Sequence, residues 1–204
     1  MRTLITVPMK NPRAAKTRLR GALSDPARDR LVRLLYRRTL EFLGPVARNH
    51  GASLAVVTGD TVAADMARTA GLAVIGEPQD TDLSGALMAA GHWAVDRGYD
   101  RLCIIPADLA APLATDMDRL LSSNAAVTIC PSVDRGTNAL LLSPPDAIRF
   151  RYGPASALRH LEEAQANGLT AVLLPLESLS FDIDTSACLT RALDVVPELQ
   201  QACS

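Results

Sequence analysis

Residues 126–142 read AVTICPSVDRGTNALLL, and this stretch decides how the predicted sheet is built. Two apolar runs, 126–131 and 138–142, flank the turn sequence Asp134-Arg135-Gly136, so two predicted strands follow one another with no helix between them. Strands joined by a short turn run antiparallel, whereas parallel neighbours need a long crossover connection. The stretch therefore predicts one reversed strand.

The rest of the chain alternates short apolar runs with longer helical patterns. Ser24-Asp25-Pro26 supplies a capping hydroxyl, an acid in the first turn and a proline where no amide donor is needed, which predicts a helix start. Near-continuous apolar strands separated by helices indicate a largely parallel sheet covered on both faces. We predict a three-layer α/β fold that forms one domain over residues 1–204.

The expected elements are as follows. Strands are predicted over residues 3–7, 54–58, 72–75, 101–106, 126–131, 138–142 and 170–174. Helices are predicted from the Ser24 cap to Asn49-His50-Gly51, over 62–70, 83–96, 114–122 and 155–167, and briefly after Thr185.

Composition narrows the class of protein. The 204 residues carry a net charge of -1, without the basic excess of a nucleic-acid binder. No apolar run approaches the ~20 residues that span a bilayer, and the order of apolar and basic residues at the N-terminus is the reverse of a signal peptide. Cys103 and Cys130 lie in apolar runs, and unpaired core thiols suit a reducing compartment. We expect a cytoplasmic protein that binds neither nucleic acid nor membrane.

The loop after the first predicted strand is strongly basic. The first 24 residues hold six basic residues and no acid, and this loop contains both lysines of the chain, Lys10 and Lys16, with Arg13 and Arg18. Such sheets bind ligands beyond the carboxyl ends of their strands, so the loop is a natural place for a triphosphate. The alternative is a solvated basic loop. The glycine fingerprints of P-loop NTPases and of dinucleotide enzymes are absent, which counts against both classes.

Three aspartates are candidates for holding a divalent cation. Asp108 follows the apolar run at 101–106, where a carboxylate could hold Mg²⁺ against a phosphate. Asp182 and Asp184 are two residues apart, and in extended chain their side chains would share a face, where two like charges need a cation or a proton. The alternatives are a turn or capping role for Asp108 and for Asp184.

Two glycine-containing loops could bind an anion. Gly136-Thr137-Asn138 enters a predicted strand, and residues 152–156, with Gly153 and Ser156, enter a predicted helix whose free amides and dipole attract anions. The alternatives are a hairpin turn and an ordinary helix cap. The remaining polar residues are expected to be structural or exposed: the three histidines His50, His92 and His160, and a solvated helix face formed by Arg28, Arg30, Arg33, Arg37 and Arg38.

Together these elements resemble a known family. In chain order they are Pro8-Met9-Lys10, Lys16-Thr17-Arg18-Leu19, Pro106-Ala107-Asp108-Leu109, GTNALLL at 136–142, the loop at 153–156 and Asp182-Ile183-Asp184-Thr185. They resemble the guanylyltransferases that make the activated precursor of the deazaflavin cofactor, coenzyme F-420. The acceptors in that family are 2-phospholactate, phosphoenolpyruvate or 3-phosphoglycerate. The resemblance covers nearly the whole chain, and GTNALLL with the downstream loop is its most specific part.

The resemblance implies a fold and a set of site residues. The fold would be of the nucleotide-diphospho-sugar transferase, or glycosyltransferase-A, type: a mixed, mostly parallel, Rossmann-type sheet between helices. The implied metal is Mg²⁺ on Asp108, Asp182 and Asp184. The implied acceptor-binding residues are Thr137, Gly153 and Ser156. The implied nucleotide-binding residues are Lys10, Arg13, Lys16, Arg18 and Ser84, with Lys10, Lys16 and Asp108 as the catalytic residues.

The resemblance also implies an activity. GMP would pass from GTP to a small phosphorylated carboxylic acid, with release of pyrophosphate. Departures from the family pattern at Arg135, Tyr152, Ala155 and Ala157 leave the acceptor open, and Ser84 stands where the family often has Asn near the base. The alternatives are another nucleotidyltransferase of the same fold, of the molybdopterin or sugar-phosphate type, and a nucleotide-binding module without turnover. Monomer and homodimer both remain open.

Overall fold

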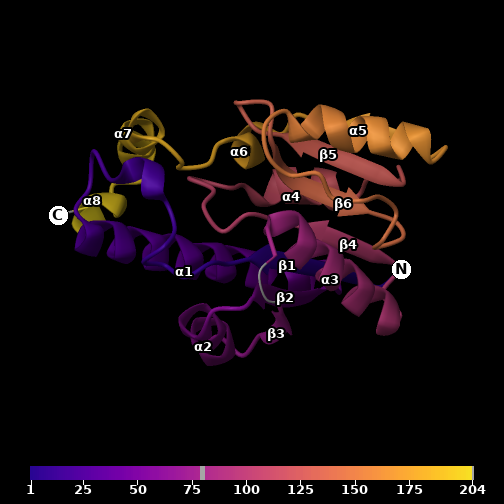
Figure 1. The fold of residues 1–204 in the computed structure, drawn as a ribbon, viewed down its shortest axis with the longest axis horizontal. Helices are drawn as coiled ribbons and strands as arrows, with labels where there is room; N and C mark the ends of the chain where they lie inside the picture. The colour runs from indigo at the N-terminus through magenta and orange to yellow at the C-terminus, as the bar shows by residue number, and fades with distance from the viewer. Residues whose placement is uncertain (79–80, 204) are drawn as a thin grey trace.

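A seven-stranded sheet forms the centre of the computed structural model, which describes residues 1–78 and 81–203 (Figure 1). The strand order is β3-β2-β1-β4-β6-β5-β7. Every pairing is parallel except those of β6 with β4 and β5, so β6 is the predicted reversed strand. The strands are β1 Thr3–Pro8, β2 Ser53–Thr58, β3 Ala73–Gly76, β4 Arg101–Ile104, β5 Val127–Pro131, β6 Thr137–Leu142 and β7 Ala171–Leu173.

Helices cover both faces of the sheet, as the near-continuous apolar strands predict. One core cluster joins alternate sheet residues to α1, α2, α4 and α6, and a second joins the intervening sheet residues to α3 and α5. The helices are η1 Thr17–Leu19, α1 Asp25–Asn49, α2 Thr61–Thr69, α3 Leu83–Asp96, α4 Ala114–Leu121, α5 Ser156–Ala166, α6 Glu177–Ser180, α7 Ser186–Val195 and α8 Leu199–Cys203. The three-layer prediction is confirmed.

The first helix begins where the sequence predicts. Ser24 Oγ accepts a hydrogen bond from the Ala27 backbone N–H at 3.3 Å, and Pro26 lies in the first turn. The apolar side of α1 packs against two groups of residues. Val32, Leu40 and Leu43 belong to the central core, whereas Leu31 and Leu35 meet the C-terminal helices.

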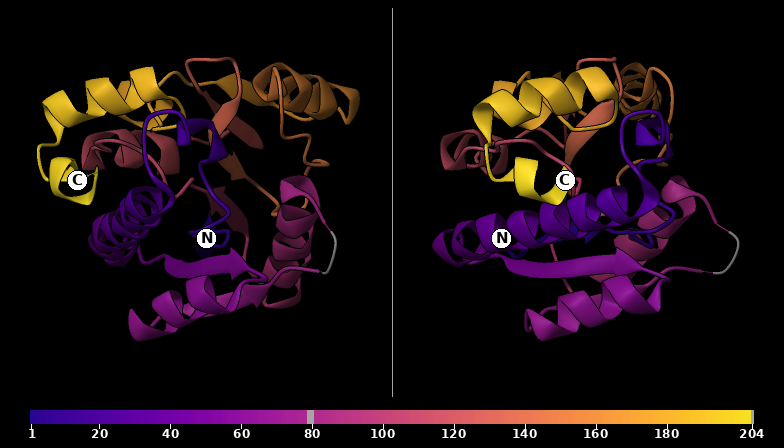
Figure 2. Two further views of the ribbon diagram at one scale, coloured as in Figure 1. Left: turned by 60° about the vertical axis from the view of Figure 1, so that its left-hand side comes forward. Right: turned by 90° about the vertical axis from the view of Figure 1, so that its left-hand side faces the viewer.

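The C-terminal helices α7 and α8 lie beside α1 (Figures 1 and 2). Thr185 caps α7 by accepting from the Cys188 backbone N–H at 3.3 Å, which confirms the predicted helix after Thr185. The short helices η1, α6 and α8 were not predicted, because three to five residues are too few for a helical period to be visible.

The turn between β5 and β6 contains an irregularity that matters for the site. Cys130 pairs with Ala139, but Pro131 pairs with Thr137, so β6 carries one extra residue at Asn138. A bulge of this kind re-aims the side chains around it. A Cβ at Gly136 would lie 2.7 Å from Ser132 Oγ, so a larger residue there would force the Ser132 side chain to move.

Two further expectations concern burial and membrane contact. Cys103 and Cys130 are fully buried, as predicted, and burial raises the pKa of the Cys103 thiol to about 12. Among the helices of the described chain, none is both long enough and apolar enough to cross a bilayer.

Candidate active site

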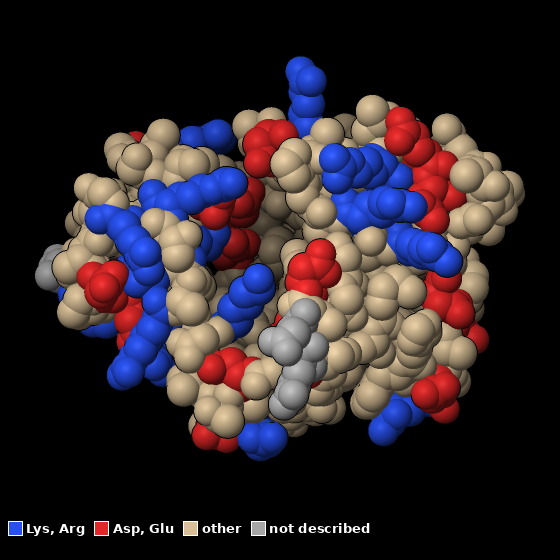
Figure 3. Space-filling view, in the orientation of Figure 1, with Lys and Arg blue, Asp and Glu red and all other residues tan. Residues whose placement is uncertain are grey.

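A cleft of about 450 Å³ opens at the carboxyl ends of β1 and β4. Figure 3 shows a hollow in this face with acidic atoms inside it and basic side chains along one rim. The basic loop after β1 forms one wall, and the Asp108 segment after β4 forms another. The cleft therefore brings together Lys10, Lys16, Asp108 and Asp184 from the predicted set.

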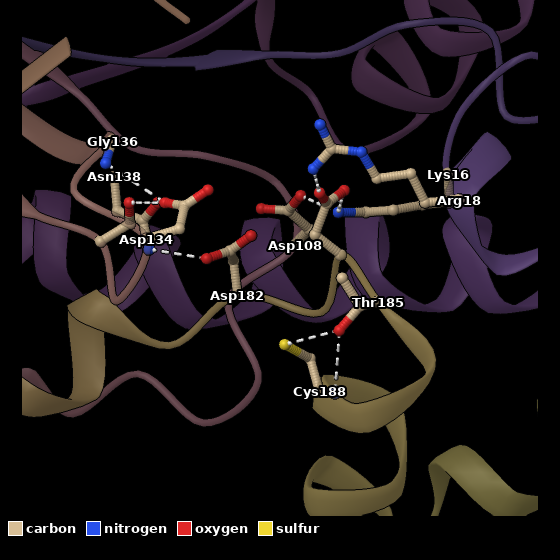
Figure 4. A network of polar contacts seen from close by, with 11 residues as sticks. Lys16, Arg18, Asp108, Asp134, Gly136, Asn138, Asp182, Thr185 and Cys188 are labelled. Carbon is tan, nitrogen blue, oxygen red and sulfur yellow. Dashed lines mark hydrogen bonds and ion pairs between the residues drawn. The ribbon is translucent and has the colours of Figure 1, made fainter. Parts of the chain in front are cut away.

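Lys16 lies between two of the predicted metal ligands (Figure 4). Its Nζ donates a hydrogen bond to Asp108 Oδ2 and lies 3.4 Å from Asp184 Oδ1. The Lys16 side chain is only 10% exposed, so this ammonium group is largely withdrawn from solvent. Arg18 binds the other oxygen of Asp184 at 2.5 Å from an exposed position. The basic loop and the acids thus form one network.

The charged groups in this network shift one another's pKa values. Burial alone would lower the pKa of Lys16, but the carboxylates of Asp108, Asp184 and Asp182 outweigh it and raise that pKa. Burial, together with the nearby Asp108 carboxylate, raises the pKa of Asp182. The carboxylates of Asp108, Asp182 and Asp184 outnumber the cations of Lys16 and Arg18 beside them, and this excess of negative charge is what a cation site needs.

The donor chemistry of this cluster fits Mg²⁺. Asp108 Oδ1 is buried and has no hydrogen-bond partner among residues 1–78 and 81–203, so one hard oxygen is available for a ligand. Asp182 Oδ1 accepts from Asn138 Nδ2 at 3.2 Å, and Asp182 and Asp184 bond to different partners. Across residues 1–78 and 81–203, no three His, Cys, Asp or Glu side chains are close enough together to hold a metal ion. Magnesium binding stays a prediction that requires these side chains to draw together.

Helix α1 holds the basic loop by its backbone. The Tyr36 hydroxyl donates to the Lys10 carbonyl at 2.8 Å and accepts from the Lys10 N–H at 2.9 Å. Arg28 Nη1 donates to the carbonyls of Arg13 and Ala15, the latter just before Lys16. The expectation that Arg28 belongs to a solvated face is wrong: its side chain is 2% exposed. Its position in the sequence carries no signal for this, because the loop carbonyls that surround it come from outside the helix.

We expect Arg28→Met to lower the free energy of unfolding by ~1–3 kcal/mol, because two loop carbonyls lose their donor in a buried place. Urea denaturation measures this change. The matched control is Arg37→Met, on the same helix at 65% exposure, which should change stability by less than ~0.5 kcal/mol. Equal effects of the two substitutions would refute the clamping role of Arg28.

Some predicted nucleotide-binding residues lie outside the cleft. The Arg13 side chain is exposed and only its backbone is held, by Arg28. Ser84 Oγ accepts a hydrogen bond from the Tyr152 N–H at 3.1 Å, so it is engaged within the protein, whereas its neighbour Leu83 lines the cleft. The structure thus gives both residues structural contacts, and their contact with nucleotide stays a prediction.

The predicted acceptor residues gather around β6 and the start of α5. Ser156 Oγ donates to Thr137 Oγ1 at 3.1 Å, and both residues are buried. Gly153 has a φ of 121°, a conformation that side-chain-bearing residues rarely adopt, and open space lies where its Cβ would be. Asn138, next to Thr137 in β6, donates from Nδ2 to Asp182 Oδ1, so β6 is linked directly to one of the predicted metal ligands (Figure 4).

One residue of this region was missed as a functional candidate. His160 is fully buried and lies 3.0 Å from Thr137 Oγ1. The sequence offered no partner for it at a recognisable spacing, because Thr137 lies 23 residues earlier on another element. A signal did exist, since His160 falls one helical turn after Ser156 and so shares its helix face.

Residues 1–193 match the sequence model of a family described as guanylyl transferase, CofC like. A 3-phospho-D-glycerate guanylyltransferase of Colwellia psychrerythraea is 37% identical over 188 residues, 91% of this chain and 88% of that protein. A 2-phospho-L-lactate guanylyltransferase of Methanothermobacter thermautotrophicus is 32% identical over 91% and 82%. A phosphoenolpyruvate guanylyltransferase of Sphaerobacter thermophilus is 34% identical over 97% and 95%.

The fold has counterparts among solved structures. One described as a nucleotide-diphospho-sugar transferase, from Desulfovibrio desulfuricans G20, superposes with a TM-score of 0.71 at 20% identity and covers 98% of this chain and 97% of its own. At that identity the likeness concerns the fold alone. It confirms the predicted fold class.

Proposed function

The chain belongs to the family of CofC-like guanylyl transferases, and from this premise we propose that it transfers GMP from GTP to a small phosphorylated carboxylic acid. The products would be pyrophosphate and a guanylylated acid that serves coenzyme F-420 synthesis in the cytoplasm. The acceptor would be 3-phosphoglycerate, 2-phospholactate or phosphoenolpyruvate, the compounds in the names of its relatives.

The observation that carries this proposal is the shared cleft. It brings two lysines and two aspartates together at the carboxyl ends of adjacent parallel strands, where nucleotides bind in such sheets. Glu77 and Leu83 line the same cleft. A triphosphate with its cation would neutralise both sets of charge.

The acceptor supplies its own nucleophile. A phosphate monoester has its second pKa near ~6, so near neutral pH its oxygens are already largely anionic and need no general base. We propose that such an oxygen attacks the α-phosphorus of GTP, forming the new P–O bond as the bond to pyrophosphate breaks. A reaction without a general base also agrees with the place of His160, which is buried and bonded to Thr137.

The protein's task is then alignment and charge neutralisation. Lys10 and Lys16 would bind the triphosphate and steady the pyrophosphate as it leaves. Asp108, Asp182 and Asp184 would hold Mg²⁺, which when bound supplies positive charge at the phosphates. Thr137, Ser156 and the Gly153 loop would bind the phospho-acid. The hydrogen bond from Asn138 to Asp182 would hold this binding region at a fixed position relative to the metal ligands.

The test is magnesium-dependent pyrophosphate release from GTP, measured in parallel with 3-phosphoglycerate, 2-phospholactate, phosphoenolpyruvate and no acceptor. We expect release with at least one of the three and none without acceptor or after chelation with EDTA. ATP, CTP and UTP run alongside measure how strictly guanine is selected.

Other results would redirect the proposal. Release only with a sugar phosphate or a molybdopterin acceptor would assign the chain to another nucleotidyltransferase reaction of the same fold. Binding of GTP without turnover on any acceptor would indicate a nucleotide-binding module instead.

A further inference from the structure

One buried side chain, His160, connects the groups of the proposed acceptor site. Its Nδ1 lies 3.0 Å from Thr137 Oγ1, and its Nε2 accepts a hydrogen bond from the Arg151 backbone N–H at 2.9 Å. Ser156 Oγ donates to the same Thr137 oxygen at 3.1 Å. The ring of Tyr152 stands edge-on to the imidazole at 5.0 Å, so the ring has little freedom to turn. His160 therefore touches both β6 and the segment that leads into Gly153.

These contacts fix the tautomer of the imidazole. A backbone N–H can only donate, so Nε2 must offer a lone pair to Arg151. A neutral imidazole has one N–H, and it must then be on Nδ1, where it donates to Thr137 Oγ1. Burial lowers the pKa of His160 to about 4, so the ring stays neutral near pH 7.

The tautomer in turn fixes the direction of the Thr137 hydroxyl. A hydroxyl oxygen has two acceptor positions, and donors from His160 and Ser156 fill both. The hydroxyl proton of Thr137 is therefore free to be donated only to a third group. Within the described chain, Thr137 Oγ1 makes no other hydrogen bond, so this proton is available to a bound ligand or to water.

We propose that His160 is a positioning residue of the acceptor site: it makes Thr137 an obligatory donor and holds the Gly153 segment beside it through Arg151. This inference rests on the proposed function, since the missing partner of Thr137 would be an oxygen of the phospho-acid. A carboxylate or phosphate oxygen accepts such a bond, whereas a group that can only donate would be rejected. The arrangement thus selects for a hydrogen-bond acceptor at this place, and an anionic oxygen forms the strongest such bond.

The first experiment needs no substrate. Long-range ¹⁵N–¹H NMR of histidine-labelled protein distinguishes the two neutral tautomers and the imidazolium. We expect the His160 signals of a neutral ring protonated at Nδ1 between pH 6 and 8, assigned by their loss in His160→Asn. A ring protonated at Nε2, or a charged ring at pH 7, would overturn the inference.

The second experiment compares two substitutions that keep opposite halves of the imidazole. Asparagine can place an N–H near the position of Nδ1, and glutamine can place an oxygen near that of Nε2. His160→Asn should keep the donor to Thr137, and its Kd for the phospho-acid should stay within a few-fold of the unsubstituted protein. His160→Gln and Thr137→Val should weaken binding roughly ten- to a hundred-fold, the usual effect of a lost hydrogen bond to an ion.

Calorimetric titration with phosphoenolpyruvate, 3-phosphoglycerate and 2-phospholactate, in the presence of a non-hydrolysable GTP analogue, gives these constants. The affinity for the GTP analogue alone should be unchanged in all three variants. Equal weakening in His160→Asn and His160→Gln, or weakening of GTP binding as well, would reduce His160 to a packing residue and overturn the inference. If the unsubstituted protein binds no phospho-acid, the proposed function fails, while the NMR result still decides the tautomer.

Discussion

Asp108→Asn should lower kcat for pyrophosphate release by at least about a thousand-fold, with little change in the fold. The substitution keeps the shape of the side chain but removes the charge that faces Lys16 and the proposed cation. Asp108 is the acid that links the two, because Oδ2 accepts from Lys16 while the buried Oδ1 has no partner in the described part of the chain. Steady-state kinetics at saturating GTP and acceptor measure the loss.

A control and a folding measurement accompany this variant. Asp65→Asn is the matched control, because the Asp65 side chain is 75% exposed on α2 and pairs with Arg68, one turn further along the same helix. It should leave kcat unchanged. The thermal midpoint of Asp108→Asn should stay within a few degrees, since Lys16 keeps Asp184 as a partner. Near-normal turnover in Asp108→Asn would remove Asp108 from the proposed metal site.

Lys16→Ala should lower kcat/KM for GTP by ~100-fold or more, because the leaving pyrophosphate loses a fixed positive charge. It should also change the response of the ligand-free protein to magnesium. Without the ammonium, the carboxylates of the proposed metal site lose the counter-charge on Asp108, although Arg18 still pairs with Asp184, and they depend more on an added cation. A thermal-shift titration with MgCl₂ should therefore give a larger increase in Tm for Lys16→Ala than for the unsubstituted protein.

The comparison needs a change in the same loop that leaves the acids alone. Arg20→Ala removes an exposed positive charge at the end of the loop, and its magnesium response should match that of the unsubstituted protein. A smaller magnesium response in Lys16→Ala than in the control would mean that Lys16 and the cation do not compete for the same carboxylates. The magnesium titration contains neither GTP nor acceptor, so it is independent of turnover.

Much of the fold was readable from the sequence because its signals are local. The apolar run and turn at 126–142 predicted the reversed strand β6, and Ser24 and Thr185 predicted helix starts that the structure confirms. The predicted strand at 101–106 ends two residues early, at Ile104, although Ile105 still donates to the Thr6 carbonyl at 2.9 Å. Apolar residues that follow the last paired residue of a strand are still buried. The sequence pattern therefore continues to predict a strand after the strand pairing has ended.

The candidate site was readable only in part, because its decisive contacts join distant segments. Lys16 and Asp184 are 168 residues apart. The sequence could suggest a phosphate-binding loop and a cation site, but not that Lys16 of the loop lies among the carboxylates of the cation site. Arg28 was misjudged for the same reason: helical periodicity describes the helix itself and not the loop that covers it. The contact between His160 and Thr137 could not be predicted either, because the two residues lie on different elements, α5 and β6, that meet in the folded chain.

The extra residue in β6 decides which face of the strand each of two polar side chains takes. Further along the strand, Ala139 and Leu141 pack on the side of the sheet covered by α1, α2, α4 and α6, and Leu140 and Leu142 pack on the side covered by α3 and α5. Uninterrupted alternation would give Thr137 to the α1 side and Asn138 to the α5 side. The bulge exchanges them, so that Thr137 meets His160 on α5 and Asn138 meets Asp182. The backbone register of β6, as well as residue identity, therefore decides which of these two side chains faces α5 and which faces Asp182.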